Sequence, residues 1–197
     1  RDELIKIHVK GRRGETIEIT QDEELDRVNF DKIPRLRPVF QPDGTVTAAN
    51  ASSINDGAAA VLLMSEDKAN EFGIQPLARI ISHANAALKP EWFTTAPSKA
   101  MPKSIAKAGL SIQDIDLFEI NEAFSIVALV NEQKLNLDPT KVNIHGGAVS
   151  MGHPIGCSGA RILVTLVYAL LQTGGKYGCA GICNGGGGAS AMVIERL

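Results

Sequence analysis

Residues Gly146–Ala160 read Gly-Gly-Ala-Val-Ser-Met-Gly-His-Pro-Ile-Gly-Cys-Ser-Gly-Ala, and the interpretation of the chain starts from this stretch. Its glycines allow backbone positions at which a side chain would clash. The stretch lies between a short apolar run, Val142–Ile144, and a long helical pattern, Arg161–Leu171. His153 is followed by a proline, whose ring restricts the backbone. We therefore expect an imidazole held in one place, although a histidine in a glycine turn is often structural or simply exposed.

A second glycine-rich segment, Gly181–Gly188, carries a thiol in the sequence Gly-Ile-Cys-Asn-Gly-Gly-Gly-Gly. A cysteine such as Cys183 is often a buried, inert packing residue. The glycines behind it favour another reading, because they allow backbone N–H groups to approach a ligand as an oxyanion hole requires. A phosphate-binding loop needs a helix directly after it, and Ala189–Ile194 resembles a strand. An imidazole near a thiol is the usual arrangement for activating the thiol at neutral pH.

The composition is that of an ordinary globular protein, with 44% hydrophobic and 21% charged residues among 197. The net charge of −2 gives no electrostatic case for binding nucleic acid or an anionic membrane. No apolar run is long enough for a transmembrane helix. The three cysteines favour neither a disulfide framework nor a zinc site, so we expect an intracellular reducing compartment, mitochondrial or cytoplasmic. The chain begins Arg-Asp-Glu-Leu, which we interpret as a cut end of a longer chain.

The pattern predicts a hairpin first and a layered α/β unit afterwards. Two alternating runs around Gly11–Gly14 predict the hairpin. Asp22–Pro38 is charged and proline-broken, which indicates a loop with at most a helical turn. Ala58–Met64 is an apolar run of buried-strand length. Further strands are expected at Leu77–His83, Leu117–Ile120, Val142–Ile144, Tyr177–Cys183 and Ala189–Ile194. Helices are expected at Ser65–Gly73, Ala96–Gly109 (started or bent at Pro102), Glu122–Leu135 and from a Ser158 cap to Leu171.

Three polar segments have an ordinary and a functional interpretation. Asn121-Glu122-Ala123-Phe124 stands at a strand-to-helix junction, where Asn is a good N-cap but its amide could also hold a water or a carbonyl. Asn50-Ala51-Ser52 is a turn or a ligand loop. The basic run of Arg27, Lys32, Arg35 and Arg37 is a solvated face or a phosphate-binding surface.

Taken together, these segments resemble the C-terminal part of the thiolase family, specifically the acetoacetyl-CoA thiolases (acetyl-CoA C-acetyltransferases). Four motifs carry the resemblance: Asn50–Ala59, Asn121–Phe124, Gly146–Pro154 and Cys183–Gly185. They occur in the family's order and spacing over nearly the whole chain. The Asn-Glu-Ala-Phe motif alone is weak, whereas the full set is highly specific.

The resemblance implies condensation of two acetyl-CoA to acetoacetyl-CoA and CoA, or the reverse thiolysis. It implies that His153 activates a nucleophilic cysteine and, with a water held by Asn121, forms one oxyanion hole. Cys183 is implied as the base that removes the α-proton of the second acetyl group, and the N–H of Gly185 as part of a second oxyanion hole. CoA and acyl contacts are implied for Ser52, Arg27, Val28, Asn29, Lys32, Phe93, Ala123 and Phe124. No covalent cofactor is implied, but carbonyls near Ala48, Ala49, Ala51 and Val149 resemble a potassium site.

The family's nucleophilic cysteine belongs to a motif that these residues lack, so the chain is expected to be inactive alone. The fold implied is thiolase-like α/β with a mixed five-stranded sheet between helices. Its expected parts are residues 1–54 (end of the loop domain), 55–76 (closing segment of the N-terminal half) and 77–197 (C-terminal half-domain). Without the N-terminal half, Ala58–Met64 is expected to be exposed. Partners implied are that half and further copies in a homodimer or homotetramer. Alternatives are a 3-ketoacyl-CoA thiolase of fatty-acid β-oxidation, against which Phe93 argues, and a non-catalytic CoA-binding half-protein.

Overall fold

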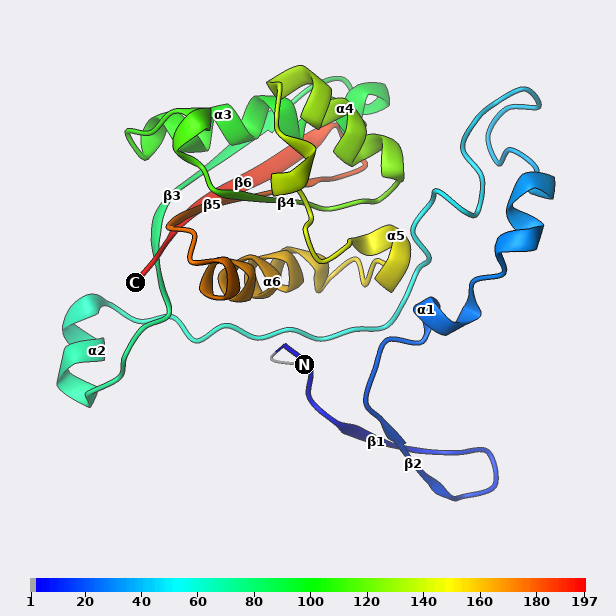
Figure 1. The fold of residues 1–197 in the computed structure, drawn as a ribbon, viewed down its shortest axis with the longest axis horizontal. Coiled ribbons are helices and arrows are strands. Elements are labelled where there is room, and N and C mark those ends of the chain that lie inside the picture. Colours follow the sequence, from blue (N-terminus) through cyan, green and yellow to red (C-terminus); the bar gives the residue numbers. More distant parts are fainter. Residues whose placement is uncertain (1–2) are drawn as a thin grey trace.

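The sheet at the centre of the molecule has four strands in the order β3-β6-β5-β4, in a computed structural model that describes residues 3–197 (Figure 1). The strands are β3 (Ala78–Ala87), β4 (Leu117–Ile120), β5 (Tyr177–Cys183) and β6 (Gly188–Arg196). β4 and β5 run parallel, whereas β6 is antiparallel to both of its neighbours. The sheet is therefore mixed, as expected from the sequence.

Helices cover both faces of this sheet, with α3 (Pro97–Lys107) and α4 (Ser125–Leu135) on one side and α6 (Ser158–Thr173) on the other (Figure 1). Because neighbouring side chains of a strand point to opposite faces, each strand contributes to two cores. Phe118 of β4 packs into the core beneath α3 and α4, and Leu117 packs into the core beneath α6. The result is the three-layer α/β arrangement that the alternation of strands and helices predicts.

Short elements connect these layers. They are η2 (Pro90–Thr95), η3 (Ile112–Asp114), η4 (Pro139–Lys141) and α5 (Ala148–Met151). The predicted C-terminal end of α3 at Gly109 is confirmed. Gly109 follows the last turn of α3 with a positive φ of 73°, and Ser111 and Asp114 form a capping box at the start of η3. Pro102 lies inside α3, which begins at Pro97 and does not start at Pro102.

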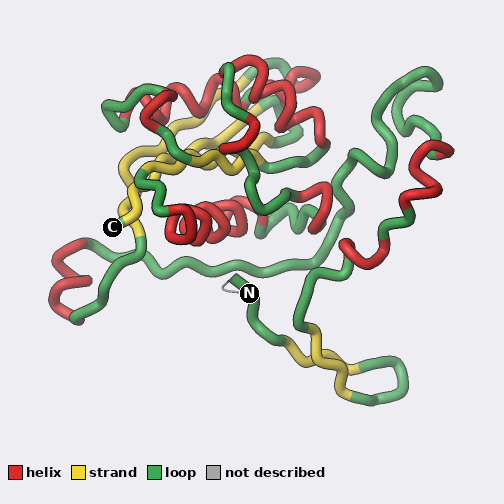
Figure 2. The backbone as a smooth tube through the Cα atoms, in the orientation of Figure 1, coloured by secondary structure: helices red, strands yellow, loops and turns green. Residues whose placement is uncertain are grey.

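The N-terminal part projects away from the sheet as the predicted hairpin (Figures 1 and 2). β1 (Ile7–Lys10) pairs antiparallel with β2 (Thr16–Ile19), and Gly14 turns the chain with a φ of 85°. The following charged segment forms only α1 (Glu24–Arg27) and η1 (Phe30–Arg35), which agrees with a loop containing little helix.

Residues 36–65 form no helix or strand (Figure 2). The segment first loops out on the side of α1 and α5, and its later part passes beneath α6 to α2 (Glu66–Phe72) (Figure 1). The prediction of a strand at Ala58–Met64 is wrong, because a strand needs a neighbour to satisfy its N–H and C=O groups. The expected exposure of this run is confirmed: Leu62 is 80% and Leu63 67% exposed. Both predicted ends of α2 are correct, since Ser65 accepts a hydrogen bond from the Lys68 amide and Gly73 has a φ of 64°.

The expected fifth strand of the sheet, Val142–Ile144, is also wrong. Val142 forms one isolated bridge with Phe118 of β4, and the Asn143 amide donates to the Phe118 carbonyl at 2.9 Å. Asn143 then adopts a φ of 47°, which is incompatible with continued strand pairing. The Asn143 side chain, and not a strand backbone, then bonds to the edge of β4: its Oδ1 accepts a hydrogen bond from the Ile120 amide at 2.8 Å.

Candidate active site

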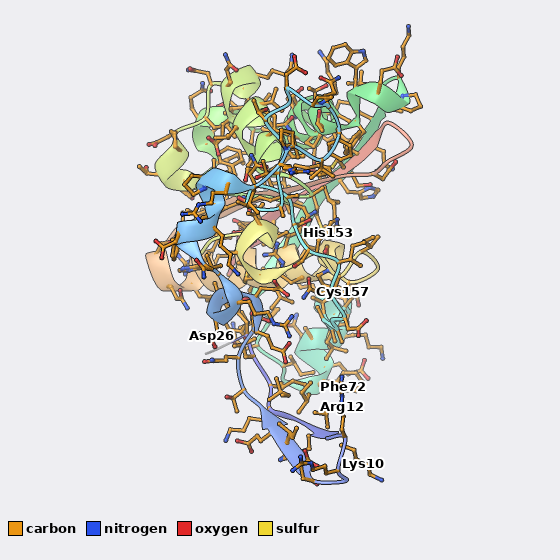
Figure 3. The ribbon with its side chains drawn as sticks, turned by 90° about the vertical axis from the view of Figure 1, so that its right-hand side faces the viewer. Lys10, Arg12, Asp26, Phe72, His153 and Cys157 are labelled. Carbon is orange, nitrogen blue, oxygen red and sulfur yellow. The ribbon has the colours of Figure 1, made fainter. Side chains whose placement is uncertain are left out.

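His153 lies where the chain leaves α5 and approaches α6, in the middle of the molecule and far from the hairpin residues Lys10 and Arg12 (Figure 3). The preceding residue, Gly152, has a φ of 95°, and a Cβ there would overlap the side-chain amide of Asn55. Only glycine satisfies both conditions without strain. The His153 amide then donates to the Ser53 carbonyl at 2.8 Å, so the backbone of the histidine is fixed by the segment 50–59.

Both nitrogens of the His153 ring have partners. Nδ1 lies 2.6 Å from the Ser158 hydroxyl, and Nε2 lies 3.3 Å from Nδ2 of Asn121. Burial lowers the pKa of His153, and the positive charge of Arg161 lowers this pKa further. The imidazole is therefore neutral near pH 7 and retains one nitrogen lone pair that can accept a proton.

Asn121 follows directly after β4 and is fully buried. Its backbone amide donates to the Gly181 carbonyl at 3.0 Å, which extends the parallel pairing of β4 with β5. Within residues 3–197, its side-chain oxygen Oδ1 has no hydrogen-bond partner. An unpaired buried amide oxygen costs about 1–3 kcal/mol. Such an atom can accept a hydrogen bond from a water or a ligand group.

Glu122 joins the Asn121–Phe124 turn to the glycine-rich stretch. Its carboxylate accepts from the Val149 amide at 3.1 Å and from Asn143 Nδ2 at 3.3 Å. A Cβ on Gly147 would overlap this carboxylate. The helix predicted to begin at Glu122 instead begins at Ser125, because the turn residues bind other segments.

Cys183 ends β5 at the same edge of the sheet, because the carboxyl ends of parallel strands lie side by side. Burial raises the pKa of its thiol above the ordinary value. The turn behind it is held by Asn184, whose Oδ1 accepts from the amides of Gly186 and Gly188. Among the described residues, no hydrogen bond starts at the exposed amide of Gly185. A backbone donor next to a thiol is thus available to a ligand.

Most of the expected acyl and pantetheine residues lie beside this edge. Ser52 Oγ and the Ser52 amide both donate to the Ala123 carbonyl, at 2.8 and 3.1 Å. The Phe124 ring packs edge-on against Phe93, with ring centroids 6.5 Å apart, and against Phe40 at 5.7 Å. The structure therefore brings together residues from four separate stretches of sequence.

The expected nucleotide contacts lie elsewhere, on α1 and η1. Arg27 forms exposed ion pairs with Glu23 and Glu24, and Val28 is exposed. No hydrogen bond or ion pair within the described chain joins Asn29 or Lys32 side chains to the His153 group. Glu24 connects α1 to the segment that holds His153, because its carboxylate accepts a hydrogen bond from the side-chain amide of Asn55 at 3.2 Å.

The residues expected at a potassium site present free carbonyls. In the part of the chain that the structure describes, no hydrogen bond ends on the carbonyl oxygens of Ala48, Ala49 or Ala51. Val149, on α5, is held by the bond from its amide to Glu122. Unbonded carbonyls are the ligand type that hard cations bind. Residues 3–197 contain no group of three or more His, Cys, Asp or Glu side chains arranged for a metal ion.

A buried contact between a carboxyl and a guanidinium group beneath the site was not foreseen from the sequence. Glu119, on β4, faces α6 and is 1% exposed, and its carboxylate lies 3.4 Å from Arg161 Nη1. Burial raises the pKa of Glu119 to about 8, partly offset by Arg161. The signal that could have revealed it is a single acidic residue in the otherwise apolar strand Leu117–Ile120. The N-cap expected at Ser158 is wrong too: Cys157 is the cap position, and Ser158 instead contacts His153.

The chain was compared with known proteins. Residues 74–196 match the family described as thiolase, C-terminal domain, and residues 1–67 match thiolase, N-terminal domain. The chain is 57% identical over 194 residues to the mitochondrial acetyl-CoA acetyltransferase of Bos taurus, covering 98% of this chain and 45% of the relative. It is 52% identical over 196 residues to the cytosolic acetyl-CoA acetyltransferase of Gibberella zeae, covering 99% and 50%.

Solved structures agree with these relatives. The acetyl-CoA acetyltransferase of Bacillus anthracis superposes with a TM-score of 0.94 at 44% identity, covering 100% of this chain and 50% of that protein. The Acat5 thiolase of Ascaris suum, in complex with coenzyme A, superposes with a TM-score of 0.83 at 46% identity, covering 91% and 47%. The chain thus spans about half the length of the curated relatives it matches. With more than half of its residues matching the C-terminal domain, this chain belongs to the thiolase family.

Proposed function

We propose that this chain carries the C-terminal part of an acetyl-CoA C-acetyltransferase site, which condenses two acetyl-CoA molecules or cleaves acetoacetyl-CoA with CoA. The observation that supports this most strongly is the contact between buried Asn121 and half-buried His153, with Asn121 Oδ1 unpartnered among the described residues. The pair lies at the sheet edge where Cys183 ends β5. A base, a thiol and free hydrogen-bond donors in one place suit acyl transfer, in which negative charge develops on a carbonyl oxygen.

His153 has the properties of a base for a thiol. A neutral imidazole takes the S–H proton onto Nε2, which leaves a thiolate and an imidazolium. By family resemblance, that thiol belongs to the half of the enzyme that these residues lack. We therefore propose that the chain alone does not complete acyl transfer, and that it acts as part of an oligomeric enzyme in a reducing compartment, the cytosol or the mitochondrion.

Cys183 is proposed as the group that moves the α-proton of the second acetyl unit. Its raised pKa keeps the thiol protonated at rest and makes its thiolate a stronger base when formed. The α-proton of a thioester is weakly acidic, so the enolate oxygen needs a donor close to the base. The free N–H of Gly185 supplies a donor two residues from the thiol.

The substrate arm is proposed to lie along Ser52 and Phe124, with Phe93 narrowing the acyl end. The edge-on contact between the Phe93 and Phe124 rings supports this proposal, since aromatic bulk at the acyl end would favour a short acyl group over a long one. Arg27, Val28, Asn29 and Lys32 are proposed to contact the nucleotide end of CoA. We propose that the free carbonyls of the Ala48–Ala51 turn, with Val149, can bind potassium, which would order this turn beside Ser52.

Thiolysis of acetoacetyl-CoA tests the proposal. The chain is joined behind the N-terminal half of the Bos taurus relative, and folding is checked by circular dichroism and a single thermal transition. We expect thiolysis by this chimera, none by the 197-residue chain alone, and a loss of about 10²-fold or more in His153→Ala. His145→Ala is the matched control, because His145 is an exposed histidine in the adjacent turn. A folded chimera that binds CoA but cleaves nothing would refute the proposed function.

A further inference from the structure

We propose that Ser158 is the positioning residue of His153: its hydroxyl oxygen accepts the Nδ1–H, so that Nε2 keeps its lone pair directed toward Asn121. The neutral His153 ring then carries its hydrogen on Nδ1. This tautomer does not depend on the proposed function, whereas its role in activating a thiol rests on that function.

The first argument is the single hydrogen of the Ser158 hydroxyl. The residue is 1% exposed, so its hydroxyl must find its partners within the protein. It donates to the Pro154 carbonyl at 3.1 Å and lies 2.6 Å from His153 Nδ1. A hydroxyl has one hydrogen and two lone pairs. When this hydrogen points to the Pro154 carbonyl, a lone pair of the hydroxyl faces the ring and Nδ1 is the donor.

The second argument comes from the opposite side of the ring and is independent of the first. The group that faces Nε2 is the amide nitrogen of Asn121, at 3.3 Å. An amide NH₂ offers only hydrogens, so Nε2 must be the acceptor. A neutral imidazole carries one N–H. Both neighbours therefore select the same tautomer, with the hydrogen on Nδ1.

Ser158 is well placed to hold the ring still. It is the first residue of α6, and its backbone amide donates at 2.8 Å to the same Pro154 carbonyl that accepts its hydroxyl. Pro154 directly follows His153. The ring, the proline carbonyl and the helix start thus form one closed loop of six residues, 153–158. Rotation of the imidazole would break the 2.6 Å contact that closes it.

Burial of the ring lowers the pKa of His153 and favours the neutral imidazole, which is the condition under which a tautomer matters. Arg161, one turn further along α6, disfavours the imidazolium. The Arg161 guanidinium contacts the carboxyl of Glu119 on β4. Glu122, which follows β4, is a second carboxylate near Glu119. Cys157 is the remaining titratable group between His153 and α6.

The chemical consequence is a base at a defined atom. When a thiol gives its S–H proton to Nε2, the S–H bond breaks, an N–H bond forms and the sulfur keeps the electron pair. The Nδ1–H bond to Ser158 persists throughout and stabilises the imidazolium. Without that acceptor, part of the population would carry its hydrogen on Nε2 and could not take the proton there.

Nitrogen-15 NMR of the 197-residue chain, labelled at histidine, tests the tautomer without any need for catalysis. The His153 signals are assigned by their absence in His153→Gln. We expect a protonated, pyrrole-type shift at Nδ1 and an unprotonated, pyridine-type shift at Nε2 at neutral pH. Loss of one hydrogen bond changes the tautomer ratio about fivefold, so Ser158→Ala should shift the ratio toward Nε2–H by that factor. Ser158→Thr, which keeps the hydroxyl, should restore it.

Ser150→Ala is the matched control, because the Ser150 hydroxyl donates to the Gly147 carbonyl at 2.8 Å in the same segment. Within residues 3–197, it makes no hydrogen bond to His153. A pyridine-type Nδ1 in the unsubstituted chain overturns the proposal, and this measurement does not depend on any variant folding. A folded Ser158→Ala variant with an unchanged tautomer ratio also overturns the proposal. In the active chimera, the expected companion result is a lower kcat with little change in KM. Failure of the chimera to show thiolysis would count against the proposed function and leave the tautomer result standing.

Discussion

Glu119→Gln tests the buried contact between Glu119 and Arg161 beneath the site through the pH dependence of stability. The Glu119 carboxyl is 1% exposed, and burial raises its pKa from 4.5 to about 8 in spite of Arg161. A carboxyl with a higher pKa in the folded state binds its proton more tightly when folded. Its contribution to stability is therefore complete below about pH 4.5 and is lost as the pH rises toward 8.

The size of the effect follows from the two pKa values. Each pH unit between them removes at most about 1.4 kcal/mol, and the whole interval corresponds to about 5 kcal/mol as an upper bound. Urea unfolding of the 197-residue chain at pH 5.5 and 7.5 should thus show a fall of up to about 3 kcal/mol from this group. Glu119→Gln cannot ionise, so this part of the fall should vanish in the variant.

The control is Glu91→Gln, at an exposed glutamate, which should retain the pH dependence of the unsubstituted chain. If the chain and Glu119→Gln lose the same free energy of unfolding between the two pH values, the reasoning is wrong. Glu119 would then be ionised at both pH values, with Arg161 compensating fully for burial.

Three further substitutions test the fold around the site. Leu166→Ala removes a fully buried α6 side chain and should lower the free energy of unfolding by about 2–5 kcal/mol. Leu171→Ala, at an exposed position of the same helix, should lower it much less. Equal losses of the two variants in urea titrations would contradict the assigned buried face of α6. Gly152→Ala forces a side chain onto a φ of 95° and should lower the free energy of unfolding by at least about 1 kcal/mol. Gly156→Ala is the control, because a Cβ at Gly156 would meet no other atom. An unchanged free energy of unfolding in Gly152→Ala would count against the assigned turn. Leu62→Lys should change stability by no more than about 0.5 kcal/mol and reduce self-association in sedimentation experiments, and a large loss of stability would show that this residue is buried.

Local signals in the sequence predicted local structure well. The alternation around Gly14 gave the hairpin, and Ser65 and Gly73 gave both ends of α2, because turns and caps depend on neighbouring residues alone. The strand predicted at Ala58–Met64 did not form, for the opposite reason. Its apolar residues resemble a strand, but strand formation depends on a partner that no local pattern describes.

The same distinction holds at the candidate site. His153 and Asn121 were expected to be near each other only through the family motifs, and the structure places their nitrogens 3.3 Å apart. The pairing of Glu119 with Arg161 was missed, because the two residues are far apart in sequence and meet only when α6 packs on β4. Ser158 was interpreted as a helix cap, since its chemistry suits either role and only the three-dimensional position of the His153 ring decides between them.

Among residues 3–197, no helix is both long enough and apolar enough to span a bilayer.

The most direct test of the proposed site is hydrogen–deuterium exchange at the α-carbon of acetyl-CoA, followed by NMR in deuterated buffer with the folded chimera. The account predicts that deuterium enters the acetyl methyl group, that Cys183→Ala reduces this exchange by about 10²-fold or more, and that Cys157→Ala, the matched cysteine control, leaves it unchanged. Exchange that survives in Cys183→Ala at the original rate would contradict the assignment of Cys183 as the proton-transfer group.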